Sequence, residues 1–302
     1  MLVVCVLACA CAGRAPAASL SFDGQVVRWR DLPAERTVVW AFGVDERRPR
    51  SLYVDVDPLI EMSPGCGRVN LTPDDPDPFW EVQCPVTVKT RELLFRFSLG
   101  DRNDRVRSAS EDLSPRFPRA VVYADAGNDQ VDDVDLVYGG AGNDRVEFAE
   151  RAFGGGGNDD MTGLRLFGDR GRDQLFGFVG GGQSATPRVY GGRGDDRLEG
   201  NGMLYGGPGD DTITSSGPIG PQMVVGGPGR DVVQLSGDEH GRDIVRLRGG
   251  GADLLRCVEN SPDIDFTFGP QDMLYVDRYD RLVGDCGGAR VLLTGRPSGF
   301  RP

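Results

Sequence analysis

Aspartate recurs in the middle of this chain at a fixed place in a glycine-rich hexapeptide. Six near-complete copies of the pattern GGxGxD, each preceded by an aromatic or aliphatic residue, start at Tyr138, Phe153, Phe167, Tyr190, Tyr205 and Val225. Glycines at the first, second and fourth positions allow positive φ and let the backbone turn its carbonyls inward. The aspartate adds a carboxylate, and oxygen ligands of this kind are what Ca²⁺ binds.

The pattern resembles the haemolysin-type calcium-binding repeat, the RTX nonapeptide GGxGxDxUx, in which U is apolar. The resemblance covers residues 99–257 and extends loosely to residue 286, with weaker copies starting at Leu99, Tyr123, Gly241 and Gly249. It implies a parallel β-roll in which successive loops stack and each Ca²⁺ is shared between neighbouring turns. Calcium is therefore the expected cofactor.

Matching the repeat residue by residue gives a candidate ligand set. The carboxylates are the sixth-position aspartates, Asp144, Asp159, Asp173, Asp196, Asp211 and Asp231, together with Asp129 from a weaker copy. The fourth and fifth positions of four loops, where the resemblance implies backbone carbonyl ligands, are Gly142, Asn143, Gly157, Asn158, Gly194, Asp195, Gly209 and Asp210. Two loops depart from the pattern, with Arg172 and Arg230 at the fifth position and, in the first of these, Asp169 in place of the second glycine.

The alternative is that these aspartates only cap turns, as aspartate often does. A turn, however, needs no fixed frame of six residues repeated six times. Carboxylates stacked along one edge would also repel each other unless a cation lay between them. Both observations favour calcium.

The spacing of the aspartates predicts the architecture. From Asp129 to Asp231 the intervals are 15, 15, 14, 23, 15 and 20 residues. A typical repeat contains one hexapeptide loop, a short strand, a tight turn and a second short strand. We therefore predict an all-β fold, a roll of about eight coils roughly 40 Å long, with calcium loops on one edge and turns that lengthen at Val179–Arg188 and Ser215–Gln222 on the other. The apolar pairs expected in its core are Val146/Phe153, Met161/Phe167, Leu198/Tyr205 and Ile213/Val225.

The flanking segments complete the predicted domain organisation: 1–17 signal peptide, 18–98 β-rich N-terminal cap, 99–256 calcium-binding roll, and 257–302 C-terminal cap and tail. Strands are expected at Thr37–Phe42, Leu52–Val56, Glu81–Lys89 and Leu93–Leu99. The order GC…C before an apolar strand ending in GDxxD resembles the N-terminal segment of actinobacterial secreted calcium-binding repeat proteins. A plain β-cap for the roll is the alternative.

The N-terminus indicates export. Leu2–Ala12 is an apolar run too short to span a bilayer, and Ala15-Pro16-Ala17 fits a signal-peptidase site although no basic residue precedes the run. Lipid anchoring at Cys9 and an uncleaved or wrongly assigned start are alternatives. Cleavage leaves Cys66, Cys84, Cys257 and Cys286, which in an exported chain predict two disulfides. Proximity favours Cys66–Cys84 and Cys257–Cys286 over zinc, since the chain has no CxxC pair and a single histidine, His240.

Composition limits the possible functions. The net charge of −12 argues against nucleic-acid binding, and no other stretch is long enough for a transmembrane helix. The sequence lacks GxSxG, HExxH and GxxxxGKS motifs. We therefore expect a secreted or cell-surface, non-enzymatic calcium-binding protein whose macromolecular partner the sequence does not reveal. The alternatives are a calcium-dependent lyase or epimerase acting on polysaccharide and an adhesin-like surface protein.

Overall fold

The computed structural model places the described residues in 26 strands of one continuous β structure. The described residues are 18–23, 25–31, 38–45, 51–56, 60–62, 64–70, 80–85, 94–108, 119–178, 185–215, 222–236, 242–247, 251–258, 270–284, 286 and 289–293. The predicted signal peptide, His240 and residues 294–302 lie outside them. In the part of the chain that is described, no helix is long and apolar enough to cross a membrane.

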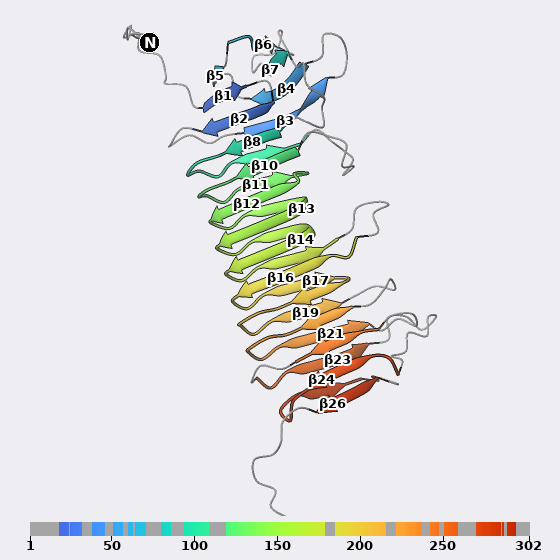
Figure 1. Cartoon of the computed structure of the whole chain (residues 1–302). Helices are drawn as coiled ribbons and strands as arrows, with labels where there is room; N and C mark the ends of the chain where they lie inside the picture. Colours follow the sequence, from blue (N-terminus) through green and yellow to red (C-terminus); the bar gives the residue numbers. More distant parts are fainter. Residues whose placement is uncertain are drawn as a thin grey trace, which may run out of the picture.

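Parallel pairing builds two stacks of strands that face each other along a rod (Figure 1). The first stack contains β2 (Val26–Asp31), β8 (Leu94–Ser98), β10 (Arg119–Tyr123), β12 (Leu136–Ala141), the second halves of β13 (Arg145–Gly156) and β14 (Asp160–Arg170), β16 (Arg188–Arg193), β18 (Met203–Tyr205), β20 (Met223–Val225), β22 (Ile244–Arg246), β24 (Met273–Val276) and β26 (Arg290–Leu293).

The second stack contains β3 (Val38–Asp45), β9 (Arg105–Arg107), β11 (Gln130–Asp132), the first halves of β13 and β14, β15 (Gln174–Gly177), β17 (Arg197–Gly200), β19 (Thr212–Ser215), β21 (Val232–Ser236), β23 (Leu254–Val258) and β25 (Arg281–Val283). Each coil thus contributes one strand to each stack. The glycine-rich loops join them on one edge; the two turns predicted to lengthen fall largely on residues 179–184 and 216–221, which lie outside the described residues. The predicted all-β roll is confirmed, but it contains more than the eight or so coils predicted, because the parallel pairing continues into both flanking segments.

The N-terminal segment is built onto the first coils. Strand β1 (Ala18–Phe22) pairs antiparallel with β2 and parallel with β5 (Ile60–Met62). Strands β4 (Ser51–Val56), β6 (Gly67–Asn70) and β7 (Trp80–Pro85) form an antiparallel group attached to β3. Because β2, β3 and β8 continue the two stacks, the parallel pairing extends across the predicted boundary at residue 98. At the other end, β24, β25 and β26 continue it beyond residue 257.

Along the repeats the core is a thin layer of aliphatic side chains, mostly one or two from each strand, whereas β2 and β8 at the N-terminal end bury the aromatic residues Trp29, Phe95 and Phe97. Val146, Met161, Leu198 and Ile213 are buried, as predicted. Their expected partners Phe153, Phe167, Tyr205 and Val225 are not, and the prediction is wrong for these four. The buried residues on the first stack are instead Ala152, Leu166, Leu204 and Val224, each one position earlier.

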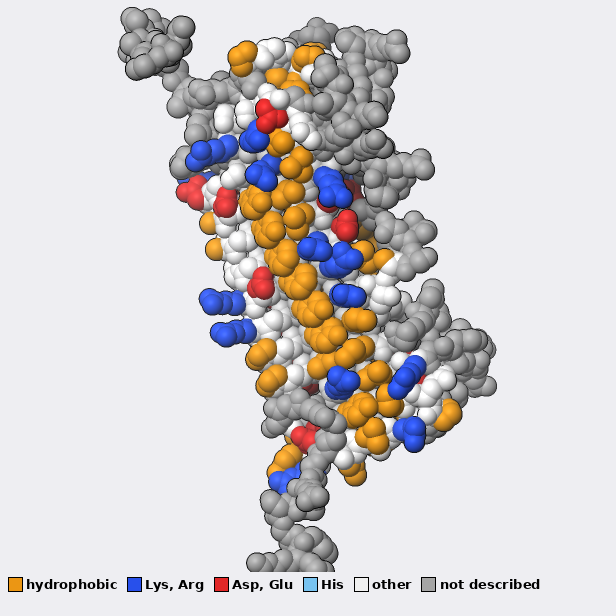
Figure 2. All heavy atoms as spheres, viewed as in Figure 1, with side chains coloured by type: hydrophobic (Ala, Val, Ile, Leu, Met, Phe, Trp, Pro, Cys, Tyr) orange, Lys and Arg blue, Asp and Glu red, His pale blue; other side chains and the backbone are white. Residues whose placement is uncertain are grey.

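The error has a simple physical cause. A shift of one residue in a strand moves a side chain to the opposite face. Between the strands of the repeats the buried positions of the first stack are taken by alanine and aliphatic residues, and the rings of Phe153, Phe167 and Tyr205 face outward. Figure 2 shows an apolar stripe running along this outer face of the rod.

Both predicted disulfides are present. Cys66–Cys84 joins the residue before β6 to β7, with Cα atoms 4.2 Å apart, and Cys257–Cys286 joins β23 to the segment after β25, with Cα atoms 5.2 Å apart. The second bond links consecutive coils where the stack of strands ends.

We expect loss of the Cys257–Cys286 bond to destabilise the last coils. The double substitution Cys257→Ser with Cys286→Ser opens a loop closed across 29 residues, which costs about 3–4 kcal/mol in the chain-entropy model. Hydrogen exchange should increase most in β23 and β25 and least in the central strands. The matched variant Cys66→Ser with Cys84→Ser should increase exchange at the opposite end. Equal effects of the two variants along the whole rod would contradict this expectation.

Candidate metal centre

The sixth-position aspartates form a continuous column on the glycine-loop edge. The backbone N–H of each one donates to the Oδ1 of the aspartate in the next coil, as from Asp144 to Asp159 and from Asp159 to Asp173, both at 2.8 Å. We call this column the aspartate ladder: Asp104, Asp129, Asp144, Asp159, Asp173, Asp196, Asp211, Asp231, Asp253 and Asp280. Its nine steps of about 4.8 Å span about 43 Å.

The ladder contains all seven predicted carboxylates and three residues missed by the candidate set. Asp104 and Asp253 lie in the weak copies that begin at Leu99 and Gly249, so the sequence contained a signal for them. Asp280 has no glycine loop before it. In the last coils aspartates also stack on the opposite edge, where the N–H groups of Gln222 and Asp243 donate to the Oδ1 of Asp243 and Asp272 at 2.9 and 2.8 Å.

A second ladder runs along the fifth positions in the opposite direction. Here the N–H of each residue donates to the Oδ1 of the previous coil, as from Asn143 to Asn128 and from Asn158 to Asn143, both at 2.7 Å. Asp210 donates to Asp195 in the same way at 3.0 Å. The two ladders bond the loops to one another through side chains, so the aspartates do more than cap their own turns.

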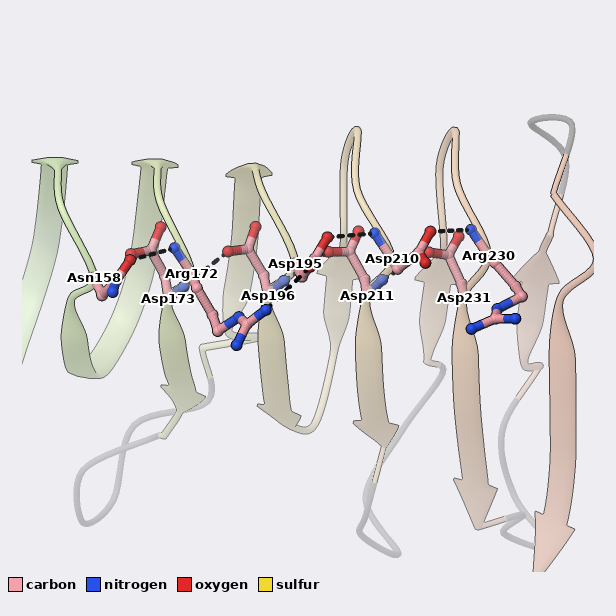
Figure 3. Close-up of polar contacts among 9 residues, drawn as sticks. All are labelled: Asn158, Arg172, Asp173, Asp195, Asp196, Asp210, Asp211, Arg230 and Asp231. Carbon is pink, nitrogen blue, oxygen red and sulfur yellow. Dashed lines mark hydrogen bonds and ion pairs between the residues drawn. The ribbon is translucent and has the colours of Figure 1, made fainter.

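The two loops that depart from the GGxGxD pattern, with Arg172 and Arg230 at the fifth position, interrupt only the fifth-position ladder. The N–H groups of Arg172 and Arg230 still donate to the previous coil, to Asn158 and Asp210 at 2.8 Å, but the guanidinium offers no acceptor to the next (Figure 3). Arg172 instead forms an ion pair with Asp195, with Nη2 3.2 Å from Oδ2. Asp173 and Asp231 keep their places in the aspartate ladder.

The second oxygen of eight ladder aspartates makes the site suitable for a cation. The Oδ2 atoms of Asp129, Asp144, Asp159, Asp173, Asp196, Asp211, Asp231 and Asp253 are buried and have no hydrogen-bond partner among the described residues. A buried carboxylate oxygen in this state is costly unless a proton or a cation neutralises it. The column repeats this arrangement in coil after coil.

Burial also changes the titration of these groups. Burial, with a smaller contribution from neighbouring aspartates of the ladder, raises the pKa of Asp129, Asp159, Asp211 and Asp231 to about 7. Burial likewise raises the pKa of Asp196 and Asp253 to about 6. Hydrogen bonds from backbone N–H groups oppose the shift without cancelling it. A divalent cation would remove both the repulsion and the cost of burying the charge.

The glycines hold open the space next to these oxygens. A Cβ on Gly154, at the first position, would collide with Oδ2 of Asp159 and lie 2.9 Å from the carbonyl oxygen of Gly168 in the next coil. Gly155 and Gly157, at the second and fourth positions, have φ of 103° and 134°. The expectation of positive φ is wrong for the first position: Gly154 is needed there for space. Asp169, which replaces a second-position glycine, keeps φ at 70°.

The donor set fits calcium if backbone carbonyls supply most ligands. Within the described ranges, no group of three or more His, Cys, Asp or Glu side chains could hold a metal by itself. Each gap between coils instead offers carboxylate oxygens of the ladder beside loop carbonyls such as that of Gly168, and Ca²⁺ accepts both. The predicted glycines and fifth-position residues Gly142, Asn143, Gly157, Asn158, Gly194, Asp195, Gly209 and Asp210 lie on the same edge. Whether they bind the ion stays a prediction.

Comparison with known proteins agrees with this geometry. A family model for the RTX calcium-binding nonapeptide repeat (4 copies) matches residues 132–150, 188–213 and 199–217. These segments contain the loops that end at Asp144, Asp196 and Asp211. No curated protein and no solved structure matches the chain. The matched segments, residues 132–150 and 188–217, are haemolysin-type RTX calcium-binding repeats.

Proposed function

We propose that this chain is an exported, non-enzymatic protein in which stacked calcium ions stabilise the roll outside the cell. The observation that carries the proposal is the column of buried, unpartnered Oδ2 atoms on the glycine-loop edge. The two disulfides support an oxidising compartment. Extracellular calcium modules bind at about 10⁻⁴–10⁻³ M, so these sites would fill only after export.

The expected energetic contribution is large for a thin roll. An ion present at ten times its Kd adds about 1.4 kcal/mol to the free energy of unfolding. Five occupied gaps would add about 7 kcal/mol, which is comparable to the whole stability of a domain. If calcium binding supplies this much of the free energy of unfolding, folding and calcium binding occur together.

A calcium titration of the full chain tests the proposal. Far-UV circular dichroism should show the β signal rising steeply with calcium, and calorimetry in the same buffer should count several ions. Magnesium is the control. It is smaller and requires near-octahedral coordination, so a site built from backbone carbonyls fits it poorly. A folded chain that neither binds calcium nor gains stability from it would refute the proposal. Mass spectrometry of the exported product, expected to begin after Ala17, tests the export step separately.

Two substitutions at Asp159 separate the metal from the hydrogen bond. Asp159→Asn keeps an Oδ1 acceptor for the N–H of Asp144 but removes the charge. Asp159→Ala removes both and leaves that N–H buried without an acceptor, which costs about 1–3 kcal/mol. We expect both variants to lose calcium stoichiometry, and only Asp159→Ala to lose stability in calcium-free buffer. Full calcium binding by Asp159→Asn would contradict a role for the carboxylate.

A further inference from the structure

The outward rings form a second regular feature of the rod. Tyr123, Tyr138, Phe153, Phe167, Tyr190 and Tyr205 occupy one register position on successive strands of the first stack. Neighbouring ring centroids are 4.7–5.1 Å apart and the ring planes differ by 2–10°. In this aromatic ladder neighbouring rings cover each other's faces. What faces the solvent is therefore the ring edges and the tyrosine hydroxyls.

A shallow trough runs beside the aromatic ladder. Its floor includes second-position glycines of successive loops, Gly140, Gly155, Gly192 and Gly207, which carry no side chains. Tyr190 and Tyr205 line one side, and Arg170 and Arg193, which are paired in register, line the other. The trough spans the coils from Gly140 to Pro208, and arginine lines it in two consecutive coils.

Arginine also lines the far side of the aromatic ladder. Arg151, Arg165 and Arg188 occupy one register position on consecutive coils, two residues before Phe153, Phe167 and Tyr190. Figure 2 shows Lys and Arg side chains on both sides of the apolar stripe. Since the chain has only one lysine and it is not described, the basic groups of this face are arginines.

These guanidinium groups are largely unused by the fold. Arg165 lies 3.6 Å from Glu150, whereas Arg151, Arg170, Arg188 and Arg193 have no ion pair with any described residue. In a chain of net charge −12, acidic side chains are plentiful, so these free cations stand out. Guanidinium pairs well with carboxylate and sulfate-like oxyanions. The face therefore offers anion-binding groups along the rod, spaced at the coil repeat of about 4.8 Å.

We propose that this face binds a linear acidic polysaccharide lying lengthwise in the trough. Arginines on either side would bind its carboxylate or sulfate groups. Ring edges carry the positive part of the aromatic quadrupole and favour contact with oxygen atoms, which cover a sugar chain. The inference uses the folded roll and extends the proposed function by naming a partner.

Other polymers fit this surface less well. Single-stranded nucleic acid binds by stacking bases on free aromatic faces, and here neighbouring rings cover those faces. An acidic peptide would add a strand to an open sheet edge, but these strands lie in the middle of a stack with both neighbours paired. A stiff chain with regularly spaced anionic groups matches the columns best.

Binding to immobilised polymers tests the proposal with the full chain in calcium, at about 0.15 M salt. The probes are hyaluronan for carboxylate, heparin for sulfate, dextran as the neutral control, and oligo-dT for nucleic acid. Wild type should bind hyaluronan or heparin but not dextran. Arg170→Gln with Arg193→Gln should weaken that binding about tenfold or more.

A charge-matched variant shows whether the site is specific. Arg145→Gln with Arg197→Gln changes the net charge equally but lies on the second stack, where both arginines pair with glutamates. Its affinity should stay within about twofold of wild type. Asp169→Asn, which removes the acidic group lining the trough and suits positive φ, should bind about threefold tighter.

Three results would overturn the proposal. They are no binding to either acidic polysaccharide, equal losses in the two double variants, or oligo-dT binding that depends on Arg170 and Arg193. Circular dichroism of every variant in calcium confirms that the roll is folded. If calcium proves unnecessary for folding, the polysaccharide measurements remain valid, so failure of the proposed function and failure of this proposal are distinguishable.

Discussion

Replacing Gly157 with alanine is expected to destabilise the roll by about 2–6 kcal/mol, with or without calcium. A Cβ at this fourth-position glycine would overlap the carbonyl oxygen of Gly142 in the previous coil, and its φ of 134° is strained for any other residue. Overpacking costs about 1–3 kcal/mol and backbone strain adds about 1–3 kcal/mol. The peptide unit before Gly142 is held on both sides, because the N–H of Gly142 donates to the carbonyl of Gly156 and the carbonyl of Ala141 accepts from the N–H of Gly127, so it has little freedom to move.

The neighbouring residue provides the control. A Cβ on Gly156 would come no closer than 3.9 Å to the carbonyl oxygen of Gly140, and its φ is not positive. Gly156→Ala should therefore change the unfolding midpoint little, whereas Gly157→Ala should lower it by about 10 °C. Thermal melts of both variants, in calcium and in calcium-free buffer, make the comparison. If Gly157→Ala were harmful only in calcium, the glycine would serve the metal site and not the stacking of coils.

This distinction shows what the sequence could reveal. The GGxGxD pattern and the interval of about 15 residues predicted the coils, the loop edge and the alignment of the seven aspartates, because stacking repeats places equivalent residues in columns. Proximity of the cysteines predicted both disulfides. The sequence could not show why each position of the loop needs glycine. A Cβ there would collide with the backbone of a neighbouring coil or with the aspartate carboxylate, and these contacts are known only from the structure.

The outward position of the aromatic residues was also beyond the sequence. Two apolar residues are neighbours on these short strands, as Ala152 and Phe153 are, so both are candidates for the core. Only the distance between the two stacks decides that alanine points inward. The hydrophobic pattern favoured the larger residue, and the thin core selected the smaller. The surface that we assign to polysaccharide exists because the aromatic rings point outward.

Acidification is expected to have opposite effects on the roll in the absence and presence of calcium. In the folded chain without metal, burial raises the pKa of Asp159 and Asp211 to about 7, above the value of about 3.9 for aspartate in an unfolded chain. The folded state therefore binds more protons than the unfolded state between about pH 4 and pH 7. Stability in calcium-free buffer must fall as the pH rises through this window, and it must recover as the pH is lowered.

Calcium reverses the pH dependence of the stability because it binds the ionised carboxylates. Each ion that binds near pH 6 displaces protons from the aspartate ladder, so affinity weakens as the pH falls. Melting curves at pH 5 and pH 7.5, in resin-treated buffer and in excess calcium, should show the higher midpoint at pH 5 without metal and at pH 7.5 with it. Asp159→Asn removes one of the shifted groups and should reduce both differences. The same pH trend in both buffers would mean that calcium does not bind the ladder carboxylates.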